Sequence, residues 1–151
     1  MLRPIIPNRE QAARLSAIER EAFEGREDPW SVDKYVRFAA NPGASIIADT
    51  DLESGLVIVR CAADEAEIVN LAVVPLVQRS GLGRKLMQAA ETFAAGNGAT
   101  RMFLEVALDN IPARQLYARL GYTMVGRRRG YYKRAGGSRM DALILFKSLA
   151  E

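Results

Sequence analysis

Apolar residues near the start of the chain recur at intervals of three and four positions, a spacing that predicts helices. Asn8 with Gln11 is typical of a capped helix start, and the apolar face continues from there to about residue 24. The break at Asp28-Pro29-Trp30-Ser31 separates this helix from a second, shorter one that ends before Asn41. We expect a short strand at Leu2–Ile6 ahead of the first helix.

The middle of the chain changes to apolar runs bounded by turn residues, which predict strands at Ala44–Asp49, Gly55–Ala63 and Glu65–Val74. Because short turns join these strands, we expect an antiparallel meander. The connection between the last two strands of the chain is basic and contains glycine. The remaining expected elements are a helix at 82–96, a strand at Met102–Ala107, a helix at Asn110–Leu120, and strands at Tyr122–Arg128 and Met140–Lys147.

These elements predict an α+β fold, with a mostly antiparallel sheet, helices on both faces, and one strand-loop-helix-strand crossover that makes two central strands parallel. At 151 residues, with 49% apolar and 26% charged residues and no repeat or long linker, we expect a single domain over 1–151. The chain start lacks the apolar segment of an export signal, and no apolar run is long enough to span a bilayer. We therefore expect a cytoplasmic protein without a membrane partner.

The cysteine and histidine content restricts the chemistry. Cys61 is the only cysteine, so no internal disulfide can form, and its apolar strand pattern favours a small core residue over a nucleophile. The chain has no histidine, which removes the commonest general base and the commonest metal ligand. We expect no metal site, and a proton-abstracting group must be a carboxylate, lysine, tyrosine or water. The net charge of +3 permits an anionic cofactor or RNA and requires neither.

The segment Gln78-Arg79-Ser80-Gly81-Leu82-Gly83-Arg84 is basic, contains two glycines and leads directly into a predicted helix. Glycines let a backbone approach an anion, and the free N–H groups of a first helical turn favour phosphate. The dinucleotide-binding fingerprint does not fit, because Leu86 stands where it needs a third glycine. A Walker loop does not fit either, because Gly83 is followed by Arg84-Lys85-Leu86. A phosphate site and an ordinary glycine-bearing helix start both remain compatible with this loop.

This loop resembles the Gln/Arg-x-x-Gly-x-Gly/Ala signature of the GCN5-related N-acetyltransferases, and the resemblance extends over nearly the whole chain. It is closest to the RimI-type ribosomal-protein alanine N-acetyltransferases. The further segments that carry it are Pro29-Trp30-Ser31, Glu67 to Pro75, Leu104-Glu105-Val106, Asn110, Ala113, Leu116-Tyr117, Gly121-Tyr122 and Gly126 to Tyr132. The resemblance implies the GNAT-type mixed sheet, with acetyl-CoA as co-substrate at the central crossover. The cofactor-binding residues that it implies are Leu71, Ala72, Val73, Arg79, Ser80, Gly81, Leu82, Gly83, Arg84 and Asn110.

Two side chains are candidates for proton transfer. The strand at Met102–Ala107 is apolar on both faces except at Glu105, and a carboxylate in such a strand is uncommon. From spacing alone, Glu105 is either paired with an arginine or water, or a base whose pKa is raised by desolvation. Tyr117 lies on the apolar face of its helix, which favours a core tyrosine. The resemblance implies that Glu105 removes the ammonium proton of the acceptor and that Tyr117 protonates the departing thiolate of CoA.

The resemblance also implies direct acetyl transfer to a primary amine, with the N-terminus of a protein, of the ribosomal-protein type, as partner. A peptide α-amine, with a pKa of about 7.7–8.0, is easier to deprotonate than a lysine at about 10.4. A small-amine or polyamine acetyltransferase and a non-catalytic acyl-CoA- or RNA-binding module remain as alternatives. In segment 127–139, arginines surround Tyr131 and Tyr132, which is compatible with a substrate entrance, an RNA contact or a solvated hairpin. Nucleic acid is therefore not a required partner.

Overall fold

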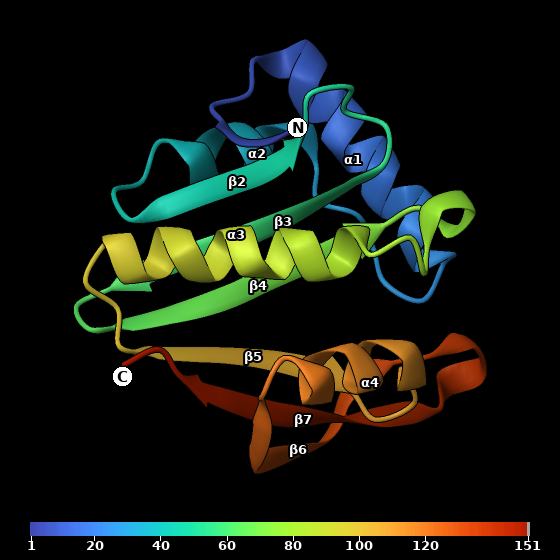
Figure 1. Cartoon of the computed structure of the whole chain (residues 1–151). Helices are drawn as coiled ribbons and strands as arrows, with labels where there is room; N and C mark the ends of the chain where they lie inside the picture. Colours follow the sequence, from blue (N-terminus) through green and yellow to red (C-terminus); the bar gives the residue numbers. More distant parts are fainter. Residues whose placement is uncertain (151) are drawn as a thin grey trace.

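A seven-stranded sheet in the order β1-β2-β3-β4-β5-β7-β6 forms the centre of the molecule (Figure 1). The computed structural model describes residues 1–150, so Glu151, the last residue of the predicted domain 1–151, lies outside the described residues. The strands are β1 (Leu2–Ile5), β2 (Ala44–Asp49), β3 (Gly55–Ala62), β4 (Glu65–Val73), β5 (Arg101–Ala107), β6 (Thr123–Lys133) and β7 (Arg139–Ser148). The helices are α1 (Arg9–Phe23), α2 (Val32–Ala39), α3 (Leu82–Gly96) and α4 (Ile111–Arg119), with short 3-10 turns η1 (Pro75–Val77) and η2 (Ala135–Gly137).

The predicted α+β architecture is confirmed. Neighbouring strands pair antiparallel except β4 and β5, which are parallel and are connected through α3. The helix predicted at 82–96 is α3, and Asn8 forms the predicted capping box with Gln11 at the start of α1. The other element ends differ from the predicted ones by about one residue, which is within the ordinary fraying of helix and strand ends.

The exception is β6, for which the predicted end is wrong. This strand continues past Arg128 to Lys133, where the sequence pattern predicts a connection. Its pairing with β7 is irregular between Arg128 and Tyr132, and Gly130 has a positive φ of 59° there. An irregularity at a glycine bends a strand without ending it. The tyrosines of segment 127–139 therefore lie on a strand and not in a loose connection.

Helices cover both faces of the sheet. On one face, Leu86 and Met87 of α3 are fully buried against the strands, and Cys61 packs at the edge of this core as predicted, with burial raising the pKa of its thiol. The other face is covered by α1 and α2 (Figure 1), and their side chains Leu15 and Tyr35 are fully buried. The two cores fix the sheet between the helices and leave one central feature open, where β4 meets β5.

A bulge in β4 marks this opening. Ile68 pairs with Val59 of β3 and Asn70 pairs with Ile58, so Val69 is an extra residue without a partner. Parallel pairing between β4 and β5 ends at the same point, with Ile68 opposite Leu104. Because a bulge bends its strand and increases its twist, the two strands diverge from there towards the start of α3 (Figure 1).

Candidate functional site

The diverging edge of β4 presents free backbone groups. The N–H of Val74 donates to the carbonyl oxygen of Ser54 at 2.9 Å, so Val74 faces β3. Successive residues of an antiparallel strand turn their N–H and C=O groups to opposite sides. The backbone groups of Leu71 and Val73 therefore face the opening, whereas those of Ala72 face Leu56 in β3. Of the three cofactor-binding residues predicted on this strand, two have the backbone orientation that the prediction needs.

The opposite edge of the opening belongs to β5. The N–H of Leu108 donates to the carbonyl oxygen of Asp141 at 2.8 Å, so Leu108 faces β7. By the same alternation, the backbone groups of Glu105 and Ala107 face the opening. Backbone groups of both strands thus face a wedge in the middle of the sheet. The carbonyl oxygen of Val73 already accepts from the Gln78 side chain and that of Ala107 from the Asn110 N–H at 3.0 Å, and the remaining groups suit an extended, amide-bearing ligand.

The predicted phosphate loop lies at the open end of this wedge. Gly81 has a φ of 89° and Arg79 a φ of 66°, and the first intrahelical bond of α3 runs from Lys85 to Gly81 at 3.1 Å. The N–H groups of Leu82, Gly83 and Arg84 precede that bond and have no partner within the helix. Two side-chain hydrogen bonds help to fix the shape of the loop: the Gln78 side chain donates to Val73 O at 3.0 Å, and the Ser80 hydroxyl donates to Val77 O at 2.6 Å.

The two glycines of this loop are required for different structural reasons. At Gly81 a side chain would meet no atom within 4 Å, so the position is open and its glycine serves the left-handed φ. At Gly83 a Cβ would lie 3.3 Å from the side chain of Leu116, so glycine permits close packing of α3 on α4. The first helical turn is therefore both unobstructed and rigidly placed, as an anion site requires.

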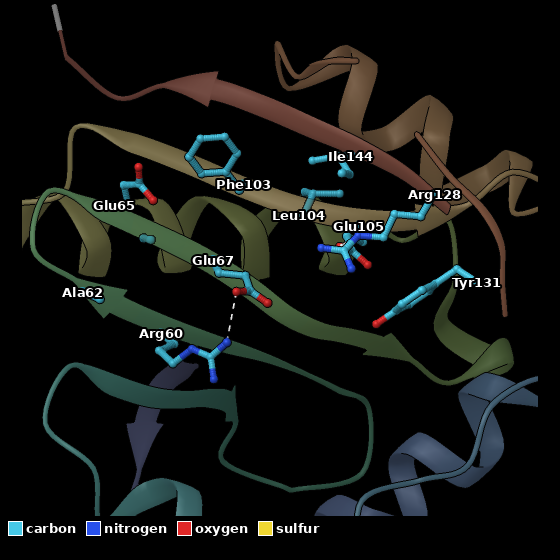
Figure 2. A pocket seen from close by; sticks show the side chains of 11 residues that line it. Arg60, Ala62, Glu65, Glu67, Phe103, Leu104, Glu105, Arg128, Tyr131 and Ile144 are labelled. Carbon is cyan, nitrogen blue, oxygen red and sulfur yellow. Dashed lines mark hydrogen bonds and ion pairs between the residues drawn. The ribbon is translucent and has the colours of Figure 1, made fainter. Parts of the chain in front are cut away.

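Glu105 lies on the side of the sheet away from α3, in a groove of about 430 Å³ (Figure 2). Its carboxylate is 2.9 Å from Nε of Arg128, and its side chain is 27% exposed. A similar pair lies further along the groove, where Arg60 contacts Glu67 at 3.0 Å. The structure thus has the arginine partner that the spacing of Glu105 allowed, and it also gives the carboxylate direct access to the groove.

Tyr117 is the buried residue of α4, and its ring packs edge-on against that of Tyr122, with ring centroids 5.9 Å apart. Burial raises the pKa of Tyr117, and the nearby Tyr132 and Glu27 raise it further. Burial likewise raises the pKa of Tyr132, with added contributions from Glu27 and Glu105. Tyr132 is therefore near both of the predicted proton-transfer residues. A raised pKa keeps the Tyr117 hydroxyl protonated, as a proton donor must be.

Asn110 caps α4, since its side-chain oxygen accepts a hydrogen bond from the N–H of Ala113 at 3.3 Å. This cap leaves the amide NH₂ of Asn110 as the group that could donate to a ligand. Asp109, its neighbour, pairs with Arg134 at 2.9 Å, and this guanidinium lowers the pKa of the Asp109 carboxyl. This pair ties the start of α4 to the end of β6.

A second groove, of about 510 Å³, opens between the α1–α2 connection and the end of β6. Glu27 and Trp30 line it from the connection, Asn70 lines it from β4, and Tyr132 lines it from β6. Tyr131 lines both grooves, so the two adjoin at this side chain, and the first of them contains Glu105. A ligand in the wedge and a ligand in these grooves would meet near Glu105.

Glu19 is a site residue that the sequence prediction missed. It is fully buried in α1 and accepts hydrogen bonds from the Trp30 N–H at 3.0 Å, from the Tyr35 hydroxyl, and from the Asn70 amide at 2.6 Å. Burial raises the pKa of the Glu19 carboxyl, and these hydrogen bonds oppose that shift. A signal was present in the sequence, because Glu19 interrupts the apolar face formed by Leu15 and Ala22.

The basic segment 127–139 is largely paired within the molecule. Arg127 contacts Asp141 at 2.7 Å, Arg128 contacts Glu105, and Arg134 contacts Asp109. The guanidinium groups of Arg128 and Arg134 also lie 5.4 Å from the ring centroids of Tyr131 and Tyr132. The segment therefore forms an ordered wall of the groove, in which several of the cations are already neutralised.

Within residues 1–150, no group of three or more acidic or cysteine side chains is arranged to hold a metal ion. None of the helices in that range combines the length and the apolar character needed to cross a membrane.

Comparison with known proteins places these features in context. A sequence profile of the acetyltransferase (GNAT) family matches residues 13–122. The ribosomal protein bS18-alanine N-acetyltransferase of Escherichia coli strain K12 is 35% identical over 121 residues, which cover 78% of this chain and 79% of that protein. The crystal structure of the ribosomal-protein-S18-alanine N-acetyltransferase from Escherichia coli has a TM-score of 0.83 at 27% identity, over 100% of this chain and 96% of that one. Arabidopsis thaliana NAA60 in complex with acetyl-CoA has a TM-score of 0.80 at 20% identity, over 98% and 97% of the two chains, which is a likeness of fold.

Proposed function

Because the chain belongs to the acetyltransferase (GNAT) family, we propose that it is an N-acetyltransferase that moves an acetyl group from acetyl-CoA to the N-terminal α-amine of a protein. One observation carries this proposal: the wedge between β4 and β5 joins an anion site at α3 to a carboxylate at Glu105. An N-acetyltransferase needs these parts in this order.

The residues of the wedge fit acetyl-CoA. The N–H groups of Leu82, Gly83 and Arg84 would hold its pyrophosphate, and the backbone groups of Leu71 with the N–H of Val73 would hold its pantetheine arm and acetyl carbonyl. When bound, acetyl-CoA supplies the activated thioester. The chain supplies position, a fixed set of N–H donors for the developing oxyanion, and the groups that move protons.

Proton transfer is assigned to the predicted pair. Glu105 takes a proton from the acceptor ammonium, which frees the nitrogen lone pair to form the new C–N bond. Tyr117 gives its proton to the sulfur as the C–S bond breaks, so that CoA leaves as a thiol. The nitrogen loses its second proton as it becomes an amide, and this proton restores the Tyr117 hydroxyl, while Glu105 gives up the first proton to solvent. The burial that raises the pKa of Tyr117 keeps that proton in place until sulfur becomes basic.

A protein N-terminus is the acceptor that we favour. The curated relative acts on ribosomal protein bS18, as its name states. The ordinary pKa values also favour an α-amine, because removing the proton of an α-ammonium group at pH 7 costs about 1 kcal/mol, whereas removing that of a lysine ammonium costs about 4.6 kcal/mol. A ribosomal-protein substrate would place this enzyme in the cytoplasm.

Peptides that begin with alanine are expected to support faster release of the CoA thiol than free amines and polyamines at equal concentration. The rate should rise about tenfold per pH unit below the pKa of the acceptor amine and level off above about pH 8, since only the neutral amine attacks. Release of the CoA thiol, followed with a chromogenic disulfide, measures both the preference among acceptors and the pH dependence of the rate. Turnover with free amines alone would favour the small-amine alternative, and binding of acetyl-CoA without any turnover would favour a non-catalytic module.

Gly81→Ala is expected to weaken acetyl-CoA binding by about 5- to 30-fold. The φ of 89° costs a residue with a Cβ about 1–2 kcal/mol, so the loop would leave the conformation that aims its N–H groups. Calorimetry with acetyl-CoA gives the dissociation constant. Gly98→Ala is a matched control, because Gly98 has a φ of 88° just past the other end of α3 and equally open surroundings. Equal weakening by both variants would contradict the anion site.

A further inference from the structure

The orientation of the Asn70 side chain follows from the chemistry of its partner. Glu19 receives the Trp30 N–H and the Tyr35 hydroxyl on Oε1 and the Asn70 amide on Oε2. An ionised carboxylate has no hydrogen to donate, so Asn70 must turn its NH₂ group towards it. The Asn70 carbonyl oxygen then points away from α1.

That carbonyl oxygen is free to bind a ligand. It accepts no hydrogen bond from any residue in the range 1–150, and no polar side-chain atom in that range is both buried and unpartnered. It is therefore reached by solvent, and the side chain that carries it lines the groove of about 510 Å³. A neutral carbonyl in this position can only accept, so it selects a ligand that donates.

The position of Asn70 along β4 is equally informative. It follows the bulge at Val69 and precedes Leu71, whose backbone faces the wedge. The bulge puts the side chain of Asn70 on the side of α1 and the groove, while the neighbouring Leu71 side chain packs in the core on the α3 side. Asn70 thus stands where the two proposed ligands meet, on the acceptor side.

We propose that the Asn70 carbonyl accepts a hydrogen bond from the amine of the acceptor, and that buried Glu19 is the positioning residue that holds the Asn70 amide in this orientation. The inference rests on the proposed function and deepens it. It gives the amine a second contact besides Glu105, one that orients the nitrogen and remains after its proton has left. The Trp30 N–H is bound by the same carboxylate, and Trp30 lines the same groove as Asn70. Glu19 would therefore position two residues of the proposed acceptor site.

Asn70→Ala and Tyr35→Phe test the first half of the proposal as a matched pair. Each removes one hydrogen-bond donor from Glu19, but only Asn70 lines the groove. With an alanine-initiated peptide, Asn70→Ala is expected to lower kcat/KM for the acceptor about 10- to 100-fold, the range for a hydrogen bond to a charged group, with the acetyl-CoA dissociation constant unchanged. Tyr35→Phe is expected to stay within about threefold of wild type. An equal loss in both variants would show a purely structural network and overturn the proposal.

A peptide that begins Ala-Pro distinguishes the amine from the next donor along the acceptor. Proline at the second position has no backbone N–H. The loss caused by Asn70→Ala should be the same on Ala-Pro and on other alanine-initiated peptides. A loss confined to peptides with an N–H at the second residue would assign the contact to that N–H and overturn the amine assignment.

Glu19→Gln tests the positioning role. A glutamine can donate as well as accept, so it no longer dictates which way the Asn70 amide turns. The variant should lower acceptor kcat/KM, and the double variant with Asn70→Ala should lose no more than Asn70→Ala alone. Additive losses would show that Glu19 does not act through Asn70. Turnover by the wild-type enzyme separates the two proposals. If no amine is acetylated, the proposed function is wrong. If the wild type is active and Asn70→Ala has the same acceptor kcat/KM, only this inference is wrong.

Discussion

Glu105→Gln is expected to lower kcat for peptide acetylation by about 10²- to 10⁴-fold while acetyl-CoA binds as before, because general base catalysis contributes a factor of this size. Glutamine keeps the shape of the side chain and can still accept a hydrogen bond from Arg128, so the groove is preserved. What it loses is the capacity to take up the ammonium proton. Single-turnover release of the CoA thiol measures the chemical step directly.

Glu67→Gln is the matched control for this experiment. Glu67 lines the same groove and is paired with Arg60 much as Glu105 is paired with Arg128 (Figure 2). Loss of an exposed ion pair alters stability by less than about 1 kcal/mol, so Glu67→Gln should keep activity within about threefold of wild type. If Glu105→Gln were as active as Glu67→Gln, the carboxylate of Glu105 would be an ion-pair partner only.

Tyr117→Phe is expected to reduce kcat by about 10²- to 10³-fold without unfolding the protein. No buried polar side-chain atom within residues 1–150 lacks a partner, and the Tyr117 hydroxyl makes no hydrogen bond there, so this hydroxyl is reached by solvent and its removal leaves no donor or acceptor stranded in the core. Phenylalanine keeps the edge-on contact with Tyr122. The defect should appear in the breakdown of the thioester and not in the binding of either substrate, which rapid-mixing kinetics and calorimetry separate.

Tyr122→Phe provides the comparison, since it removes the other hydroxyl of the same aromatic pair. That hydroxyl donates to Glu91 of α3 at 2.8 Å, and neither residue lines the groove that contains Glu105. Its loss should lower the free energy of unfolding by about 1 kcal/mol and leave kcat unchanged. A Tyr117→Phe enzyme that kept full kcat would require another proton donor for sulfur, and water in the wedge would then be the first candidate.

Local signals in the sequence were sufficient for most of the fold. α3 was predicted with its observed bounds because Gly81 precedes it and Asn97-Gly98 follows it, and the start of α1 was predicted because Asn8 and Gln11 satisfy each other. The end of β6 was not predictable in this way. Gly130 with its basic neighbours reads as a turn, and only pairing with β7 keeps the segment extended.

The candidate site depends more on contacts distant in sequence. The loop at residues 79–84 is local and was found, but the Glu105–Arg128 pair reaches across β7, which lies between the two strands. Glu19 and Asn70 are 51 positions apart, and each is an ordinary residue in its own segment. Only the fold turns a polar interruption in α1 and an asparagine in β4 into one hydrogen-bonded unit.

The unpaired Val69 has a consequence for how such a slot can be gained or lost. Removing this residue would leave its neighbours on their present faces and in their present register with β3, since Ile68 and Asn70 already pair with consecutive residues there. What would disappear is the bend that carries β4 away from β5. Deletion of Val69 is therefore expected to let β4 pair further along β5 and to narrow the proposed cofactor site, although Glu105 and Tyr117 themselves would be unchanged.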